Sequence, residues 1–209
     1  MAEREGAADP LATARETVAR DEVLRRLLHA SGSGLPLLYV LGWARWWQVT
    51  ALLVAGVVIA LALEVVRLVV GLDWWIYEHL TREYEQDSLA GYALYFISSA
   101  PVAAVFAPRV AVPAILMLTL ADPVSGLLGS SELRTVKRPF VLLAMFGVST
   151  SIAAPFVAPG AAVLGGLAAT VADGVKPVFA GYVVDDNLTI PPAAAVAMWA
   201  GLLLEAGVA

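Results

Sequence analysis

Long apolar blocks alternate with short polar segments along most of this chain of 209 residues. A helix needs about 20 mostly apolar residues to cross the hydrocarbon core of a bilayer. Blocks close to that length lie at roughly 29–47, 48–70, 91–107, 110–129, 140–158, 160–172 and 190–207. The pattern predicts an all-α, polytopic membrane protein with about seven transmembrane helices. The first block is interrupted by "ASGSG" and the sixth is short and rich in glycine, so a re-entrant segment is the alternative for both.

The segment before the first block has a different pattern. Asp9 and Pro10 form a helix-start signal, an N-cap residue followed by proline at the first helical position. Apolar residues then recur at steps of three, four or six residues, at Leu11, Ala14, Val18, Leu24 and Leu28. This spacing predicts an amphipathic helix on the membrane surface, with an ordinary solvent-facing helix as the alternative. We therefore divide the chain into residues 1–28, a polar tail with this helix, and residues 29–209, a single polytopic membrane domain.

The composition supports a membrane protein and excludes several other classes. Hydrophobic residues make up 60% of the chain, charged residues 15%, and the mean hydropathy is +0.79. Soluble domains are nearer half apolar. The chain has no cysteine, which excludes disulfides, thiolate metal ligands and a cysteine nucleophile. It has no basic surface of the kind that binds nucleic acid. The composition leaves the oligomeric state open.

The distribution of charge predicts which side of the membrane each loop faces. Seven spans with the N-terminus in the cytoplasm leave Arg45 and Arg109 at the outer face, and the other eleven Lys and Arg at the inner face. An excess of Lys and Arg in cytoplasmic loops is the usual arrangement. Seventeen of the eighteen acids also fall at the inner face, and only Glu205 lies at the outer one. We therefore expect a protein of the cell membrane whose active site faces the cytoplasm and handles a soluble, phosphorylated substrate.

The first polar cluster at that face lies in "DEVLRRLLHASGSG". Arg25, Arg26 and His29 share nearly one helical face, because residues three or four apart are neighbours on a helix. Two guanidinium groups and an imidazole at the membrane surface are suited to binding phosphate. The alternative is simple anchoring of the span by positive charge.

A second cluster surrounds Asp122 in "LADPVSGLLG", inside the otherwise apolar fourth block. An acid at membrane depth is by default a candidate functional residue, with a buried partner for an arginine as the alternative. Gly126 and Gly129 permit close approach of a ligand or another backbone. Lys137 and Arg138, in the loop that follows, are placed to screen phosphate charge.

The third cluster, "DDNLTIP", stands directly before the last apolar block. Asp185, Asp186 and Asn187 offer hard oxygen ligands, and Mg²⁺ is typically bound by one or two carboxylates together with substrate phosphates. We expect the last helix to start at the pair Pro191 and Pro192, because proline is favoured in a first helical turn.

Taken in order, "RRLLH", "TREYE", "LADPVSGLLG", "VADG" and "DDNLTIP" resemble the dolichol kinase and phytol kinase family of integral membrane proteins. The resemblance runs from about residue 22 to residue 200, and "DDNLTIP" is its most specific part. It implies phosphorylation of a membrane-dissolved isoprenoid alcohol of the dolichol, polyprenol or geranylgeraniol type by a nucleoside triphosphate, CTP in that family. Asp173 stands where the family tends to carry Glu. Val141 and Leu142 stand where the family carries a Glu-Gly pair after its basic residues.

The mechanism that follows assigns roles to three groups of residues. The ligands of Mg²⁺, or of another divalent cation, are expected among Asp122, Asp185, Asp186 and Asn187. The nucleotide phosphates are expected to bind Arg25, Arg26, Gly129, Lys137 and Arg138. The alcohol is expected to lose its proton to Asp122 or Asp186, with His29 as the other candidate.

Three other interpretations fit parts of the pattern. A phosphatidate cytidylyltransferase-like enzyme also uses CTP at the inner face, although the Gly-rich stretch and paired Asp residues typical of its C-terminal part are not evident. The second is a diverged, non-catalytic membrane protein of the same fold, which the missing Glu-Gly pair favours. The third is a transporter or membrane partner protein, which predicts an internal hydropathy repeat or polar residues near mid-bilayer. Neither feature is evident in this sequence.

Overall fold

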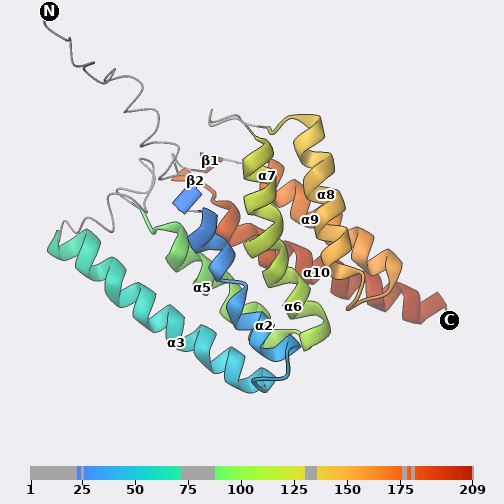
Figure 1. The fold of residues 1–209 in the computed structure, drawn as a ribbon, viewed down its shortest axis with the longest axis horizontal. Coiled ribbons are helices and arrows are strands. Elements are labelled where there is room, and N and C mark those ends of the chain that lie inside the picture. The colour runs from blue at the N-terminus through green and yellow to red at the C-terminus, as the bar shows by residue number, and fades with distance from the viewer. Residues whose placement is uncertain are drawn as a thin grey trace, which may run out of the picture.

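The structure is a computed structural model that describes residues 23–24, 26–71, 88–129, 136–175, 178–179 and 182–208. Within these ranges the chain is almost entirely helical (Figure 1). The helices are α2 (Gly34–Val40), α3 (Trp46–Val65), α5 (Gly91–Val105), α6 (Pro108–Leu116), α7 (Asp122–Leu128), α8 (Pro139–Ala153), α9 (Pro159–Gly174) and α10 (Asp186–Val208). A helical stretch also covers residues 26–31, and two-residue strands β1 (Val178–Phe179) and β2 (Tyr182–Val183) form a hairpin before α10.

Two π-helical turns extend these helices. Val66–Val70 continues α3, and Met117–Ala121, called the π segment below, joins α6 to α7. Among the described residues, three helices are long and apolar enough to cross a membrane: Trp46–Val70, Pro108–Leu128 and Asp186–Gly207. The all-α membrane architecture is therefore supported. The helices α5 and α8 are apolar but shorter.

Three expectations about helix limits need correction or fall outside the described residues. The block 29–47 is not one continuous helix, because the chain turns at Gly32 and Ser33 and α2 has only seven residues. The expected amphipathic helix lies mostly in residues 11–22, outside the described ranges. The last helix starts at Asp186 and not at Pro191, so both prolines lie inside α10. Proline in a helix interior removes one backbone hydrogen bond, and a side chain of α5 replaces the bond that Pro191 removes.

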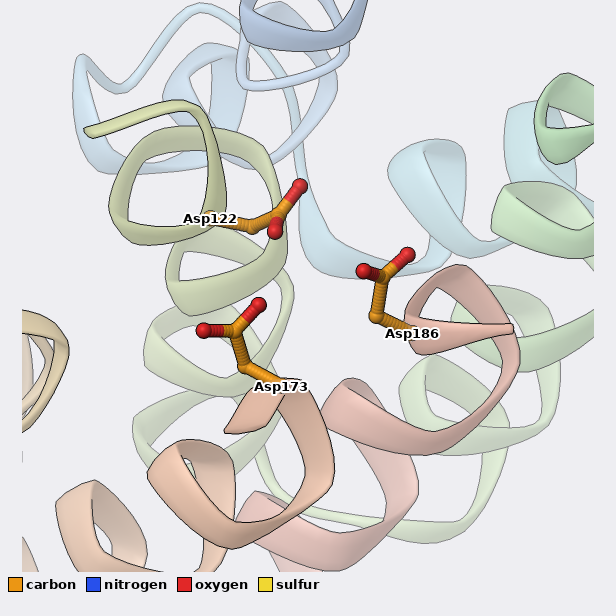
Figure 2. Close-up of side chains that lie close together, drawn as sticks. All are labelled: Asp122, Asp173 and Asp186. Carbon is orange, nitrogen blue, oxygen red and sulfur yellow. The ribbon is translucent and has the colours of Figure 1, made fainter. Parts of the chain in front are cut away.

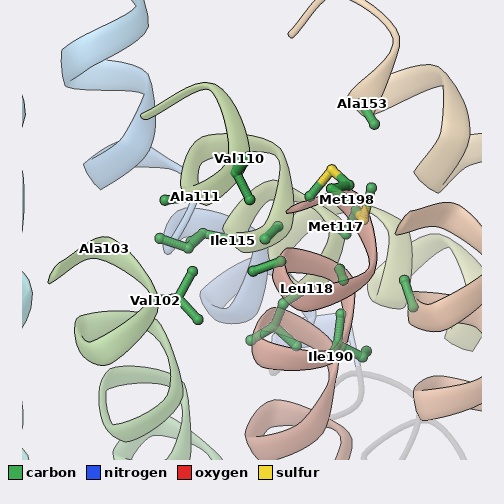
Figure 3. Packing of buried hydrophobic residues seen from close by; sticks show 14 of the residues in the cluster. Val102, Ala103, Val110, Ala111, Ile115, Met117, Leu118, Ala153, Ile190 and Met198 are labelled. Carbon is green, nitrogen blue, oxygen red and sulfur yellow. The ribbon is translucent and has the colours of Figure 1, made fainter. Parts of the chain in front are cut away.

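The helix Pro108–Leu128 lies at the centre of the bundle. Its most apolar window is 72% buried, against 28% for Trp46–Val70 and 39% for Asp186–Gly207. Ile115, Met117 and Leu118 on the central helix are fully buried and lie close to Ile190 and Met198 of α10 (Figure 3). The helix α3 runs along one side of the bundle and packs mainly on α5. Most of its apolar surface therefore faces away from the bundle, where it is suited to contact lipid.

Glycine and alanine allow the last three helices to pack closely. A Cβ added at Gly201 of α10 would lie 2.7 Å from the Cα of Ala161 on α9. One added at Gly165 of α9 would lie 2.3 Å from Cγ of Met198. Helices in lipid associate through such close backbone approach, because lipid supplies no hydrophobic drive for them to associate. The contact of α9 with α10 is the most extensive helix pair in the described structure.

Hydrogen bonds between helix ends show the relative direction of neighbouring helices. Nε1 of Trp46, at the start of α3, donates to the carbonyl of Ala103 near the end of α5, over 3.1 Å. The amide of Gly160, at the start of α9, donates to Oε1 of Glu205 near the end of α10, over 3.0 Å. Each pair is therefore antiparallel, as an up-and-down bundle requires.

A buried ion pair near the end of the helix Trp46–Val70 links this helix to the start of α5. Glu64, which is 2% exposed, pairs with Arg67 over 2.5 Å between Oε2 and Nη2. Arg67 also donates to the carbonyl of Ser88, and the amide of Ala90 donates to Glu64. A buried charge in an apolar helix needs such a set of partners.

The glycine contacts generate the first prediction. The substitution Gly201→Ala forces Cβ into the backbone of α9, and we expect it to lower the free energy of unfolding by about 1–3 kcal/mol through overpacking. The matched control is Gly147→Ala on α8, where an added Cβ meets nothing within 4 Å. Thermal unfolding in detergent should show a lower Tm for Gly201→Ala alone. Equal Tm values for the two variants would contradict the close approach.

Candidate functional site

Three carboxylates from three helices meet at one end of the bundle (Figure 2). Asp122 begins α7, Asp173 lies at the end of α9, and Asp186 begins α10. One oxygen from each lies within 4.8 Å of the others. Asp173 and Asp186 are almost completely buried, at 0% and 2% exposed. We call these three residues the acidic cluster.

Lys137 reaches the acidic cluster through a fixed backbone contact. Its amide donates to the carbonyl of Gly174 over 3.1 Å, in an isolated antiparallel bridge between residues 136 and 175. Its Nζ then lies 2.5 Å from Oδ1 of Asp173 and 3.8 Å from Oδ1 of Asp122. The ammonium is therefore a counter-charge to two members of the cluster at once.

Ser125 completes this arrangement one turn after Asp122. Its hydroxyl donates to Oδ2 of Asp173 over 2.7 Å and accepts from Nζ of Lys137 over 3.0 Å. Ser125 itself is completely buried. Both oxygens of Asp173 are thus bonded, so its position relative to α7 is fixed.

The electrostatics of the acidic cluster suit a cation. Like charges this close oppose ionisation of one another, and burial adds a desolvation cost. Carboxylate oxygens grouped at this separation are the donors that Mg²⁺ prefers, with the remaining positions left to water or phosphate. The donor set in the structure therefore fits a divalent cation.

The residues next to Asp186 shape the start of α10. Oδ1 of Asp185 accepts from the amide of Asn187 over 2.9 Å and from Nδ2 of Asn187 over 2.6 Å. Asp185 thus forms an Asx turn at the helix start, whereas Asp186 joins the acidic cluster. Oδ1 of Asn187, which is buried, has no hydrogen-bond partner among the described residues.

The proline inside α10 explains a bond from α5. In a regular helix the carbonyl of Asn187 would accept from the amide of residue 191, but Pro191 has no N–H. The hydroxyl of Ser98 donates to this carbonyl instead, over 2.6 Å. Ser98 therefore stabilises the turn that carries Asp186.

Four of the predicted site residues lie together at the acidic cluster. These are Asp122, Asp186, His29 and Lys137, and Nε2 of His29 lies 3.8 Å from Oδ2 of Asp122. The guanidinium of Arg26 lies against Gly126, four residues after Asp122.

The other predicted residues lie at the edges of the site or outside the description. Gly129 ends α7, and its amide bonds back to the carbonyls of Ser125 and Gly126. Arg138 is exposed at the start of α8. Arg25 is outside the described residues.

Two members of the site were not among the predicted catalytic or metal-binding residues. Asp173 was noted only for its place in the family pattern, and Ser125 was given no role. The available signal for Asp173 was an acid next to an apolar block, as for Asp186. Nothing in the local sequence marked Ser125.

Compared with known protein families, curated proteins and solved structures, the chain matches none. The acidic cluster and its neighbours are therefore the basis on which its function is inferred.

The bond from Ser98 generates the second prediction. Ser98→Ala leaves the buried carbonyl of Asn187 without its donor, so we expect the free energy of unfolding to fall by about 1–3 kcal/mol. Pro191→Ala supplies a backbone N–H for the same carbonyl, and the loss from Ser98→Ala should be smaller in that background. A double-mutant cycle from thermal unfolding measures the coupling. Strictly additive effects would contradict this explanation.

Proposed function

We propose that this chain is a membrane kinase that transfers a phosphoryl group from a nucleoside triphosphate to an isoprenoid alcohol dissolved in the bilayer. The observation that carries the proposal is the acidic cluster, which three separate helices form beside Lys137 at the end of an apolar bundle. The resemblance of "DDNLTIP" and the accompanying motifs to dolichol and phytol kinases supplies CTP as the donor and a dolichol-like alcohol as the acceptor.

The residues that would hold Mg²⁺ are Asp122, Asp173 and Asp186. The buried Oδ1 of Asn187, with no partner among the described residues, is a fourth candidate. When bound, Mg²⁺ would supply neutralising charge to the phosphate oxygens of the nucleotide. Asp173 enters this set from the structure, while Asp185 is assigned to the helix start.

The basic residues around the acidic cluster would bind the nucleotide phosphates. Lys137 is the nearest, and its ammonium has donors that phosphate oxygens accept. Arg26 lies over α7 at Gly126, and Arg138 is exposed next to Lys137. Arg25 is assigned the same phosphate-binding role from its place in the sequence. Positioning and charge stabilisation are the main requirements of phosphoryl transfer, so such a set is what the reaction needs.

The proposed reaction joins the alcohol oxygen to the γ-phosphorus. The bond between that phosphorus and the oxygen bridging to the β-phosphate breaks, and the nucleoside diphosphate leaves with the bond electrons. A carboxylate, Asp122 or Asp186, accepts the proton of the alcohol. The isoprenoid chain stays in lipid between helices, and its hydroxyl reaches the acidic cluster at the membrane surface.

The proposal also places the protein in the cell membrane with seven crossings and a cytoplasmic N-terminus. The antiparallel helix pairs and the position of the acidic cluster at one bundle end support this arrangement. The nucleotide then reaches the site from the cytoplasm.

Single cysteines provide the third prediction, because the chain has none of its own. Trp43 is exposed in the turn before α3, on the proposed outer side, and Val136 is exposed on the proposed inner side. We expect a membrane-impermeant maleimide to label Trp43→Cys in intact cells and Val136→Cys only after permeabilisation. Labelling of Val136→Cys in intact cells would reverse the proposed orientation.

The fourth prediction concerns transfer itself. Membranes with the full chain, given γ-labelled CTP or ATP, Mg²⁺ and isoprenoid alcohols of different length, should form a labelled lipid phosphate. We expect Asp122→Asn, Asp173→Asn and Asp186→Asn each to lower kcat/KM by at least about 100-fold, because each removes charge placed to stabilise transfer. The matched control is Glu205→Gln, an acid at the opposite end of α10 that keeps its acceptor for Gly160.

The products distinguish the proposal from its rivals. Release of a nucleoside diphosphate supports the kinase, whereas pyrophosphate and a cytidylyl lipid would indicate cytidylyl transfer. Wild-type activity in a folded Asp186→Asn variant would overturn the assigned mechanism. No product from any nucleotide would indicate a non-catalytic protein.

A further inference from the structure

The helical stretch at residues 26–31 lies on the face of the central helix that carries Asp122. Nε2 of His29 lies 2.9 Å from the carbonyl oxygen of Leu118, four residues before Asp122. The guanidinium of Arg26 lies against Gly126, four residues after it, where an added Cβ would be 3.3 Å from Cζ. Residues four apart share a helix face, so these contacts lie on either side of Asp122.

The backbone of the π segment explains why Leu118 can accept a side chain. In an α-helix the carbonyl of Leu118 would accept from the amide of Asp122, but that amide donates to Met117 instead. In a π-helix the carbonyl of Leu118 would accept from residue 123, which is Pro123 and has no N–H. His29 therefore supplies the hydrogen bond that the π segment and the proline together remove.

The direction of this bond identifies the proton on His29. A carbonyl oxygen only accepts, so Nε2 of His29 must be the donor and carry the hydrogen. The same nitrogen faces Asp122. In a neutral imidazole the lone pair then belongs to Nδ1, so the nitrogen nearest the acidic cluster is not free to take a proton.

The end of this helical stretch is also held in place. The hydroxyl of Tyr95 donates to the carbonyl of Gly32 over 2.8 Å. A Cβ added at Gly32 would lie 3.1 Å from Cγ2 of Thr119, inside the π segment. The interruption in "ASGSG" thus allows His29 to approach the central helix closely.

We propose that His29 is a positioning residue, which fixes the backbone before Asp122 and so shapes the cation site, and that it is not the general base. This inference rests on the proposed function in one respect, that Asp122 serves a divalent-cation site. It separates His29 from the two carboxylates as candidates for the base, which the sequence left open.

The test uses Mn²⁺ as the probe and the purified full chain in detergent. Electron paramagnetic resonance reports free and bound Mn²⁺ without any need for turnover. We expect His29→Ala to weaken Mn²⁺ binding about 10- to 100-fold, as loss of a supporting partner does at metal sites. His29→Gln keeps an N–H donor near the place of Nε2, and we expect it to bind within about threefold of the wild type. The control is Ser31→Ala, which removes only a local bond to Leu28.

A second measurement reads the hydrogen bond without a metal. Pro123→Ala restores a backbone N–H, and either helical register then gives the carbonyl of Leu118 an amide donor. We expect His29→Ala to lower Tm less in the Pro123→Ala background than in the wild type. Additive effects on Tm would overturn the bond to Leu118 as the role of His29.

The outcomes separate this inference from the proposed function. Unchanged Mn²⁺ affinity in His29→Ala overturns the positioning role while the cation site stands. Normal Mn²⁺ binding by His29→Gln with transfer activity lost as in His29→Ala would instead make His29 the base. No Mn²⁺ binding by the wild type overturns the cation site itself, and the Tm cycle still decides whether His29 fixes Leu118.

Discussion

The structure depends on how the bundle satisfies backbone carbonyls that proline leaves without a donor. A buried carbonyl without a donor is costly, because bulk water does not reach it. Pro123 follows Asp122 directly, and Pro191 lies five residues after Asp186. In each case a side chain from another segment supplies the missing bond: His29 to Leu118, and Ser98 to Asn187. The turns that carry the two carboxylates are thereby fixed by groups outside their own helices.

The negative charge of the acidic cluster also depends on fixed partners. Three carboxylates within 4.8 Å are costly unless they are held and compensated. Lys137 compensates part of this charge, and its position follows from the backbone bond between residues 137 and 174. Because Ser125 and Lys137 each donate to one oxygen of Asp173, the rigid side of the site is the junction of α7 with α9. Each oxygen keeps a second lone pair for a cation. Such fixed groups are what a phosphoryl-transfer site requires.

The apolar part of the bundle supports this arrangement. Small residues bring α9 and α10 close together, so Asp173 and Asp186 come from neighbouring helices in a tightly packed pair. The central helix is the most buried of the three long ones, and it carries Asp122 to the end of the bundle. Asp122 is thus carried by the most buried of these three helices, and Asp173 and Asp186 by a closely packed pair. A lipid substrate and a water-soluble donor meet most readily at such an end.

From the sequence alone, apolar block length determined the all-α membrane class, because the bilayer dictates how long and how apolar a spanning helix must be. An acid inside one apolar block and an acid directly before another identified Asp122 and Asp186, because charge at membrane depth is costly unless it has a role. Only the tertiary structure decided that Asp173 joins them and that Asp185 turns toward Asn187. It also decided that α10 begins before its prolines. These outcomes depend on contacts between segments far apart in the chain, such as Ser98 with Asn187, which no local pattern contains.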